Sequence, residues 1–307
     1  MMRRALVAVL IVGLVTPAAA EAPVSIPGHA IDRRVTGGIS GVAVGLGLVS
    51  QLIPIRAREP WNSELVEIDE GVRDNFSPRA MHVADAMLGL SLGAPAIYLM
   101  GSSIDDSDGD KLLLYGQSIA INALLAGTAK RLVQRPRPYT YSRDPVAMKF
   151  AKAAGDDAYL SFYSGHAALS FGAAVTGAYL LGASGESETA TSVAWGAGLA
   201  VAAATATMQV RAGKHFPSDV LIGSAVGIAV GYLVPALHAD DKPYAPSGQD
   251  VAAAATGIVG GILLSSLLPL GGRKSEIDAK APAVTGLGFS PMAVQGGGFG
   301  LSITGGM

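Results

Sequence analysis

Three groups of residues in this chain carry side chains that could bind an anion or move a proton, and the first group is basic. Its sequence, KRLVQRPRPY, runs from Lys130 to Tyr139. Arg135 and Arg137 each precede a proline, and these prolines restrict the backbone and hold the guanidinium groups in place. Arginine presents a planar fork of donors that suits phosphate oxygens. A basic flank on the cytoplasmic side of a membrane helix is the alternative.

The second group lies where a polar loop enters an apolar stretch. Its sequence is SFYSGHAALSF, residues 161–171. Ser164, Gly165 and His166 would stand at a helix N-terminus, where free N–H groups and the helix dipole attract anions. Gly165 lets the backbone approach an oxyanion, and His166 is placed to give a proton to a leaving oxygen. The alternative is an ordinary N-cap at Ser164 beside a packed histidine.

The third group, in QVRAGKHFPSDVLIG, contains a histidine and an aspartate four residues apart. In a helix-like turn, Asp219 can reach one imidazole nitrogen of His215. That hydrogen bond would fix the tautomer and leave the other nitrogen free to attack phosphorus. Lys214 and Arg211 add positive charge. The alternative is a capped helix start with a solvated histidine.

Seven apolar stretches must position these groups. They lie at about residues 37–54, 81–101, 112–130, 166–183, 191–210, 219–237 and 251–270. Each is near the length of a membrane span, and most are rich in alanine and glycine, which let helices approach closely. The pattern predicts an all-α, membrane-embedded bundle of about six or seven apolar helices with the active site at one end. Buried helices of an alanine-rich soluble domain are the alternative.

Composition supports an apolar protein and excludes several kinds of site. Only 15% of the 307 residues are charged, against about 25% in an average soluble domain. The formal net charge of −2 offers no global attraction for nucleic acid, which we do not expect as a partner. The chain has no cysteine, so disulfides, thiolate metal sites and a cysteine nucleophile are excluded.

The N-terminus and the tail differ from the apolar core. Residues 1–20 combine Arg3 and Arg4, a short apolar run and three alanines, which predicts a signal peptide. An N-terminal segment with one weak apolar helix would follow at 21–80, a helical core at 81–240, and an extra apolar helix with a Gly-rich tail at 241–307. From Gly286 to Met307 we expect one short strand or a disordered tail.

Taken together, the three groups resemble the motifs of the type 2 phosphatidic acid phosphatase and vanadium haloperoxidase superfamily. The first motif, K-x6-R-P, matches at Lys130, Arg137 and Pro138. The second, P-S-G-H, matches at Ser164, Gly165 and His166, with tyrosine in place of the proline. The third, S-R-x5-H-x3-D, matches at His215 and Asp219. The resemblance spans about residues 80–240, and each motif falls at the boundary of an apolar stretch.

One position departs from the family pattern. Gln209 stands where the family has an arginine, and Met208 where it has a serine. Gln209 can donate hydrogen bonds to phosphate but carries no charge. In a regular helix Arg211 would point to nearly the opposite side. If the helix has already ended, Arg211 could take over the phosphate contact.

The resemblance implies a two-step transfer without a metal or other cofactor. His215, oriented by Asp219, would attack phosphorus to form a phosphohistidine, while His166 would protonate the leaving alkoxide and later activate water. The phosphate oxygens would be held by Lys130, Arg137, Ser164 and Gly165, with Gln209 and Arg211 as further candidates. Positioning and charge neutralisation are what phosphoryl transfer needs most.

Three functions fit these residues. The first is a phosphatase acting on a lipid phosphate or diphosphate, such as phosphatidate, phosphatidylglycerophosphate or undecaprenyl diphosphate. The second is a vanadate-dependent haloperoxidase, and the third is a non-catalytic lipid-phosphate binder, which the neutral Gln209 would explain. We expect an integral protein of a bacterial inner membrane. If residues 37–54 do not cross, the site faces the periplasm, which we prefer. The oligomeric state is left open.

Two further groups of polar residues receive no functional role. Asp106, Asp108 and Asp110 mimic the start of a calcium loop, but Lys111 replaces its glycine. His82 and Asp85 share a helix face on which nothing else is expected to converge, so a satisfied polar contact is the better interpretation.

Overall fold

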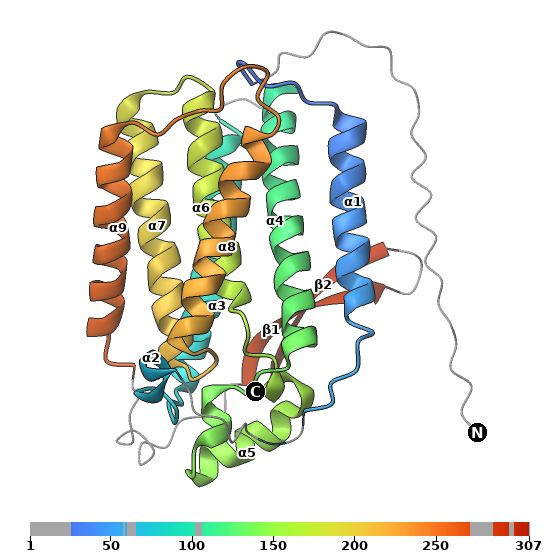
Figure 1. The fold of residues 1–307 in the computed structure, drawn as a ribbon, viewed down its shortest axis with the longest axis vertical. Helices are drawn as coiled ribbons and strands as arrows, with labels where there is room; N and C mark the ends of the chain where they lie inside the picture. The colour runs from blue at the N-terminus through green and yellow to red at the C-terminus, as the bar shows by residue number, and fades with distance from the viewer. Residues whose placement is uncertain are drawn as a thin grey trace, which may run out of the picture.

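The computed structural model describes residues 26–57, 59, 66–101, 106–270, 285–294 and 298–306 of the chain. Within this part, seven long helices run side by side as a bundle (Figure 1). They are α1 (Arg33–Ser50), α3 (Pro78–Leu99), α4 (Asp106–Val133), α6 (Gly165–Ala183), α7 (Glu188–Arg211), α8 (Pro217–Ala236) and α9 (Gly248–Leu267). The prediction of an all-α bundle is confirmed, and each helix coincides with one predicted apolar stretch to within six residues at either end.

Local sequence explains where several helices begin. A serine hydroxyl accepts a backbone amide at the first turn of four of them. These N-cap residues are Ser77, Ser164, Ser187 and Ser247. Helix α8 instead starts with proline at its first position and with Asp219 in its first turn. Both devices satisfy or avoid the free N–H groups of a helix start.

The outer faces of the bundle are apolar, which fits a membrane. Among the described residues, six helices are long and apolar enough to cross a bilayer, namely all of the seven except α1. Helix α6 lies in the middle of the bundle, where 72% of its 18-residue apolar segment is buried. In the corresponding segment of α9, only 17% is buried. On α9, Leu263, Leu264 and Leu267 remain 59%, 70% and 79% exposed. A contiguous apolar surface of this kind is stable against lipid rather than water.

Glycines bring α6 and α8 into backbone contact, and this contact sets the relative position of the two helix starts. Every fourth residue of α8 on this face is glycine: Gly223, Gly227 and Gly231. A Cβ atom at Gly227 would overlap the carbonyl oxygen of Ala168. Such small-residue spacing lets membrane helices pack closely. At the end of this interface, the amide of Ser164 donates to the carbonyl oxygen of Asp219 at 3.1 Å.

Helix α1 extends over the same depth as α4. At one end, Nε of Arg33 donates to Oδ1 of Asp110 at 2.6 Å. At the other, Nη2 of Arg131 donates to Oε1 of Gln51 at 3.0 Å. Asp110 and Arg131 are separated by about 32 Å along a regular helix, close to the thickness of a bilayer core. Helix α1 therefore runs beside α4 over most of its length, although it is not one of the six helices that are apolar enough to cross a bilayer.

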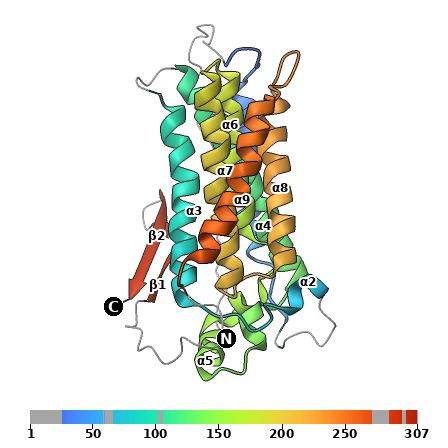
Figure 2. The same cartoon turned by 90° about the vertical axis from the view of Figure 1, so that its left-hand side faces the viewer.

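The long segment between α4 and α6 is not a plain loop. It contains α5 (Pro145–Ala154) between two 3₁₀ helices, η1 (Pro138–Tyr141) and η2 (Gly155–Tyr159). The short helix α2 (Glu67–Glu70) also lies at this end of the bundle (Figure 2). Together these pieces cover the ends of α4, α6 and α8.

The C-terminal tail forms two strands, rather than the one short strand or the disordered tail that the sequence predicts. Strand β1 (Thr285–Val294) pairs antiparallel with β2 (Gly298–Gly306), and β1 contacts α3. Figure 2 shows the hairpin beside that helix. The predicted signal peptide, residues 1–20, lies outside the described residues.

Candidate active site

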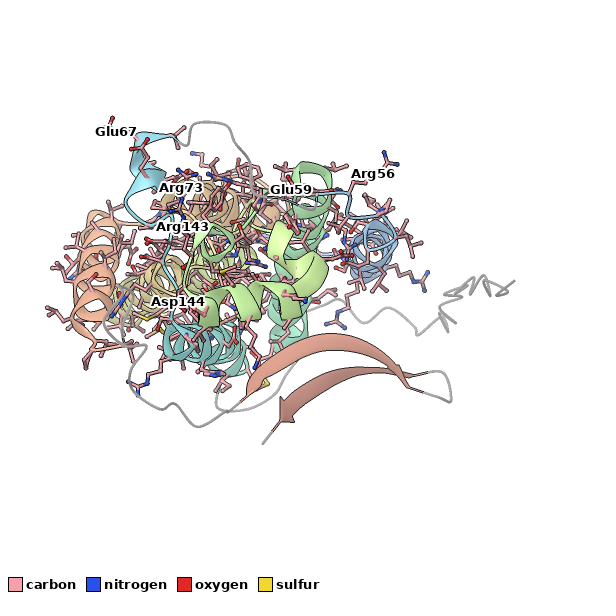
Figure 3. The ribbon with its side chains drawn as sticks, turned by 90° about the horizontal axis from the view of Figure 1, so that it is seen from below. Arg56, Glu59, Glu67, Arg73, Arg143 and Asp144 are labelled. Atoms are coloured by element: carbon pink, nitrogen blue, oxygen red, sulfur yellow. The ribbon has the colours of Figure 1, made fainter. Side chains whose placement is uncertain are left out.

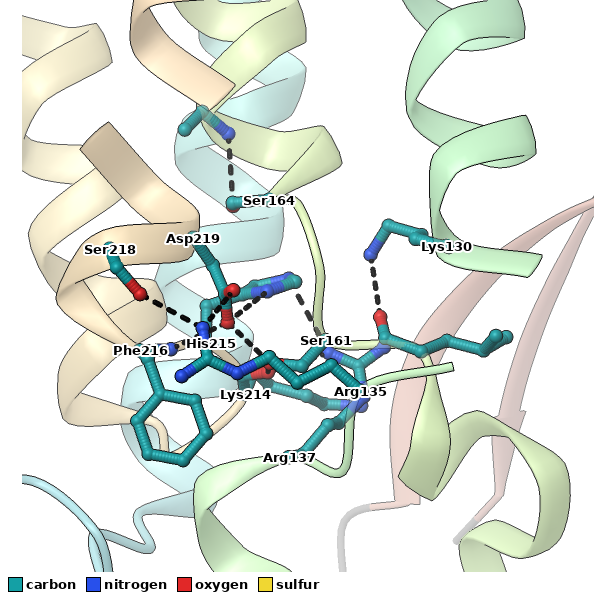
Figure 4. A network of polar contacts seen from close by, with 12 residues as sticks. Lys130, Arg135, Arg137, Ser161, Ser164, Lys214, His215, Phe216, Ser218 and Asp219 are labelled. Carbon is teal, nitrogen blue, oxygen red and sulfur yellow. Dashed lines mark hydrogen bonds and ion pairs between the residues drawn. The ribbon is translucent and has the colours of Figure 1, made fainter. Parts of the chain in front are cut away.

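The three predicted groups meet at one end of the bundle, where α4 ends and α6 and α8 begin (Figure 4). Lys130 lies in the last turn of α4, and Arg137 follows in the proline-rich segment. His215 lies in the turn between α7 and α8. Burial and the positive charges of Lys130 and Arg137 lower the pKa of His215 well below its usual 6.5.

His215 is held by the tight turn that ends α7. The amides of Lys214 and His215 donate to the carbonyl oxygen of Gln209 at 3.2 and 3.3 Å. Gly213 makes this turn with φ of 73°, a conformation that favours glycine. The ring of His215 is buried, and its Nε2 lies 3.4 Å from Nη1 of Arg137. Since arginine can only donate, Nε2 is the unprotonated nitrogen, available as a nucleophile.

The expected hydrogen bond between His215 and Asp219 is not formed. Oδ2 of Asp219 lies 3.9 Å from Nδ1 of His215, which is too long for a hydrogen bond. Nδ1 has no hydrogen-bond partner among the described residues. Oδ2 accepts instead from the hydroxyl of Ser161 at 2.6 Å and from the amide of Phe216 at 3.0 Å. These two shorter bonds hold the carboxylate in place, so it acts on the imidazole through its charge.

Arg135 connects two buried carboxylates that are far apart in sequence. Its Nη1 donates to Oδ1 of Asp219 at 2.6 Å, and its Nη2 to Oδ2 of Asp69 at 2.8 Å. Asp69, in α2, also accepts from the amide and the hydroxyl of Ser218, at 3.0 and 2.5 Å. The guanidinium carbon lies 4.2 Å from the ring centre of Phe216. Arg135 is thus a structural cation beneath the site, a partnership with Asp69 that no sequence pattern indicated.

Arg137 is held by the carboxylate of Asp157 and by the backbone carbonyl of Lys214. Its Nη2 donates to Oδ1 of Asp157 at 2.8 Å, and its Nη1 to the carbonyl oxygen of Lys214 at 2.8 Å. Nζ of Lys214 lies 3.2 Å from the other carboxylate oxygen of Asp157. Burial alone would raise the pKa of Asp157, but the charges of Arg137 and Lys214 outweigh it and hold that pKa below its usual range. Asp157 therefore stays ionised and orients both cations.

Lys130, Ser164 and Gly165 lie together at the start of α6. Nζ of Lys130 donates to the carbonyl oxygen of Leu160 at 2.9 Å. A Cβ atom at Gly165 would lie 3.6 Å from Cε of Lys130, so the lysine stem runs along this glycine. The hydroxyl oxygen of Ser164 accepts the amide of Ala167 at 3.3 Å, so Ser164 is the N-cap of α6. The serine is fully buried.

His166 faces a residue to which the sequence assigned no functional role. Its Nε2 lies 2.8 Å from Oδ1 of Asp85, which comes from the second turn of α3. The side chains of His166 and Asp85 are 28% and 30% exposed. Setting Asp85 aside was wrong in one respect, because the second histidine of the site does converge on it. The two residues are 81 positions apart in sequence, so no local pattern indicates this contact.

Arg211 and Gln209, the two further candidates for a phosphate contact, lie in different surroundings. Helix α7 continues through Arg211, so the condition for that side chain to swing into the site is not met. Arg211 donates instead to the carbonyl oxygens of Ser265 and Leu268, at the end of α9. Its assignment as a phosphate ligand is therefore wrong. Gln209 is buried, and its backbone supports the His215 turn.

The described residues contain no group of three or more His, Cys, Asp or Glu side chains that could hold a metal ion. The calcium-like aspartates lie at the other end of the bundle. There, Asp108 pairs with Lys111 at 2.8 Å and Asp110 pairs with Arg33 at 2.6 Å. Cations of the chain itself occupy those carboxylates.

The central part of the chain matches one known protein family. Residues 111–243, from α4 to the segment after α8, match the family model of the PAP2 superfamily. No curated protein and no solved structure gives a significant match. The matched segment contains the candidate site residues from Lys130 to Asp219, whereas Asp69 and Asp85 precede it.

Proposed function

Residues 111–243 belong to the PAP2 superfamily, which supports a phosphatase-type enzyme, and from this premise we propose a lipid phosphatase that works through a phosphohistidine. The observation that carries the proposal is the setting of His215. Its ring is buried, and its Nε2 lies 3.4 Å from the guanidinium of Arg137. A neutral imidazole beside fixed cations is suited to attack a phosphate ester.

The first half of the proposed reaction transfers the phosphoryl group to the enzyme. Nε2 of His215 attacks phosphorus, and the bond between phosphorus and the ester oxygen breaks. His166 gives its proton to the departing alkoxide, so the alcohol leaves neutral. The charge that develops on the imidazole of His215 is stabilised by Asp219 across the 3.9 Å gap. Arg137, Lys130 and the N-terminus of α6 hold the non-bridging oxygens.

The second half returns the enzyme to its starting state. A water molecule attacks the phosphohistidine, and His166, now neutral, takes a proton from it. The bond between phosphorus and Nε2 breaks, its electron pair returns to the ring of His215, and inorganic phosphate leaves. All charge neutralisation in this scheme comes from the chain's own cations. Lys214, adjacent to the nucleophile, adds a positive charge that Gln209 does not provide.

The bundle supports a substrate with an apolar tail. The site lies at the end of helices whose outer faces are apolar, so a phosphate head group can reach it while an acyl or prenyl chain stays in the bilayer. Phosphatidate, phosphatidylglycerophosphate and undecaprenyl diphosphate all meet this description.

The test of the function is phosphate release by the purified protein in detergent with EDTA. Short-chain phosphatidate, phosphatidylglycerophosphate and a prenyl diphosphate serve as substrates, and bromide oxidation with added vanadate is run in parallel. Release that survives chelation is the expected result. Bromide oxidation without phosphate release would favour a haloperoxidase instead. Binding of the lipids without either reaction would favour the non-catalytic binder, with the uncharged Gln209 as its cause.

The pH dependence of this activity follows from His215. Because burial and the charges of Lys130 and Arg137 lower its pKa, the imidazole stays neutral at pH values well below 6.5. We therefore expect kcat/KM to keep its full value on the acid side until well below pH 6.5, and to fall only when Nε2 is protonated. A profile measured from pH 4 to pH 9 checks this, and an acid limb centred near 6.5 would contradict it.

The basic residues that do not belong to the site indicate which side of the membrane the site faces. At the site end these are Arg56, Arg73, Arg79, Arg131, Arg143, Lys149, Lys152 and Arg211; three of them are labelled in Figure 3. At the other end they are Arg33, Arg34, Lys111 and Lys242. Basic residues accumulate on the cytoplasmic side of membrane proteins. We infer from this distribution that α1 crosses with the six more apolar helices, and that the site faces the cytoplasm rather than the periplasm.

This orientation can be measured because the chain has no cysteine of its own. We expect Lys242→Cys to react with a membrane-impermeant maleimide in intact bacterial cells. Arg143→Cys should react only after the cells are permeabilised. Both variants should retain the phosphatase activity of the parent. Labelling of Arg143→Cys in intact cells, with protection of Lys242→Cys, would place the site in the periplasm.

A further inference from the structure

The candidate site contains an aspartate outside its three sequence motifs. Asp85 reaches the site from the second turn of α3, and its Oδ1 lies 2.8 Å from Nε2 of His166. Both side chains are about one-third exposed, so the contact lies at the wall of the site rather than in the core. We propose that Asp85 is a positioning residue for His166, which fixes its tautomer and stabilises its protonated form. This inference rests on the proposed phosphatase function.

The geometry assigns the two nitrogens of His166 to different partners. An ionised carboxylate can only accept, so Nε2 carries a proton and donates it to Asp85. Nδ1 is then the nitrogen that exchanges a proton with the substrate. In the protonated ring, Nδ1–H is given to the departing alkoxide. In the neutral ring, Nδ1 takes a proton from the attacking water, so one arrangement serves both halves of the reaction.

The surroundings of His166 explain why a carboxylate is needed there. Lys130 comes from α4, and Lys214 and His215 come from the turn between α7 and α8. Positive charge on these neighbours disfavours a proton on His166, whereas the carboxylate of Asp85, 2.8 Å from Nε2, favours it. Without Asp85, the same cations that hold the phosphate would drive the proton off the general acid. The contact with Asp85 thus opposes the effect of these cations on His166.

The test compares two substrates whose leaving groups differ. Short-chain phosphatidate releases a basic alkoxide that needs a proton, whereas p-nitrophenyl phosphate releases a stable phenolate that does not. For Asp85→Asn we expect kcat with phosphatidate to fall by about 10- to 100-fold, with little change in KM. The alkaline limb of the pH profile should move to lower pH by about one unit, because the protonated ring loses its counter-charge.

The same variant should give a distinct time course with p-nitrophenyl phosphate. The first step needs no general acid, but hydrolysis of the phosphoenzyme still needs His166 as a base. We expect a burst of p-nitrophenol equal to the amount of enzyme, followed by slow turnover. Asp85→Glu should recover part of the phosphatidate activity, since its carboxylate can still reach Nε2. Asp74→Asn, at an exposed aspartate in the turn after α2, is the matched control and should behave as the parent.

The outcomes separate this inference from the proposed function. If the parent protein releases no phosphate from either substrate, the function itself fails. If the parent is active and Asp85→Asn keeps its rate and pH profile, only the positioning role fails. Equal losses on both substrates, without a burst and without a shift of the alkaline limb, would mean that Asp85 merely supports the fold, and would also overturn the inference.

Discussion

Replacing His215 with alanine is expected to abolish phosphate release, with a loss of about four orders of magnitude or more. The proposed nucleophile is one buried imidazole, and no other histidine occupies the same position relative to Arg137. His166 faces Asp85 and is assigned the proton transfers, so it cannot take over the attack. Loss of a covalent nucleophile removes the whole two-step route, leaving only electrostatic binding of the phosphate.

The measurement is steady-state phosphate release together with trapping of the intermediate. After an alkaline detergent quench with ³²P-labelled substrate, the parent should carry an acid-labile, alkali-stable label that His215→Ala lacks. With labelled p-nitrophenyl phosphate, whose leaving group needs no proton, His166→Ala should still accept the label and lose it slowly, because it retains the nucleophile. His238→Ala is the matched control, since His238 lies at the opposite end of the bundle, where it bonds to Thr36 and Val234. A label that persists in His215→Ala would assign the nucleophile elsewhere.

Replacing Arg135 with methionine is expected to destabilise the protein and to remove its activity. The substitution keeps much of the side-chain volume but leaves Asp69 and Asp219 buried without their shared cation. Breaking a buried ion pair from one side costs about 3–5 kcal/mol, because an uncompensated charge remains. The loop of His215 would also lose its anchor, since Asp219 binds the amide of Phe216 at 3.0 Å.

Thermal unfolding in detergent and phosphate release measure the two consequences. Adding Asp69→Asn to Arg135→Met should recover part of the lost stability, because it removes one of the two unpaired charges. Arg143→Met is the matched control, because this arginine is exposed at the same end of the bundle (Figure 3). If Arg135→Met unfolds at the parent's temperature and keeps its activity, the network around Asp69 and Asp219 is not what holds the site.

The helices and the local motifs could be predicted from the sequence alone. An apolar stretch of membrane-span length consists of consecutive residues and can be recognised without knowing the fold. The composition therefore predicts α1, α3, α4 and the four later helices. The motif residues are equally local: Ser164 begins a helix because a serine side chain caps it, and the turn around Gly213 sets His215 ahead of α8. The two-stranded tail was less certain, because its glycine-rich pattern fits either a strand or a coil.

Only the tertiary structure decided which side chains meet across the bundle. The partner of His166 lies 81 residues away, and the Ser218 amide bonds to Asp69 across 149 residues. The sequence offers Arg211 as a phosphate ligand, but α7 continues through this residue and its side chain bonds to the carbonyl oxygen of Leu268 at the end of α9. Asp219 has the right spacing to bond His215, but Ser161 and Phe216 compete for it. Each helix is determined by the pattern of apolar residues within its own segment. These contacts depend instead on how the helices pack against one another, and no single segment of the sequence specifies that packing.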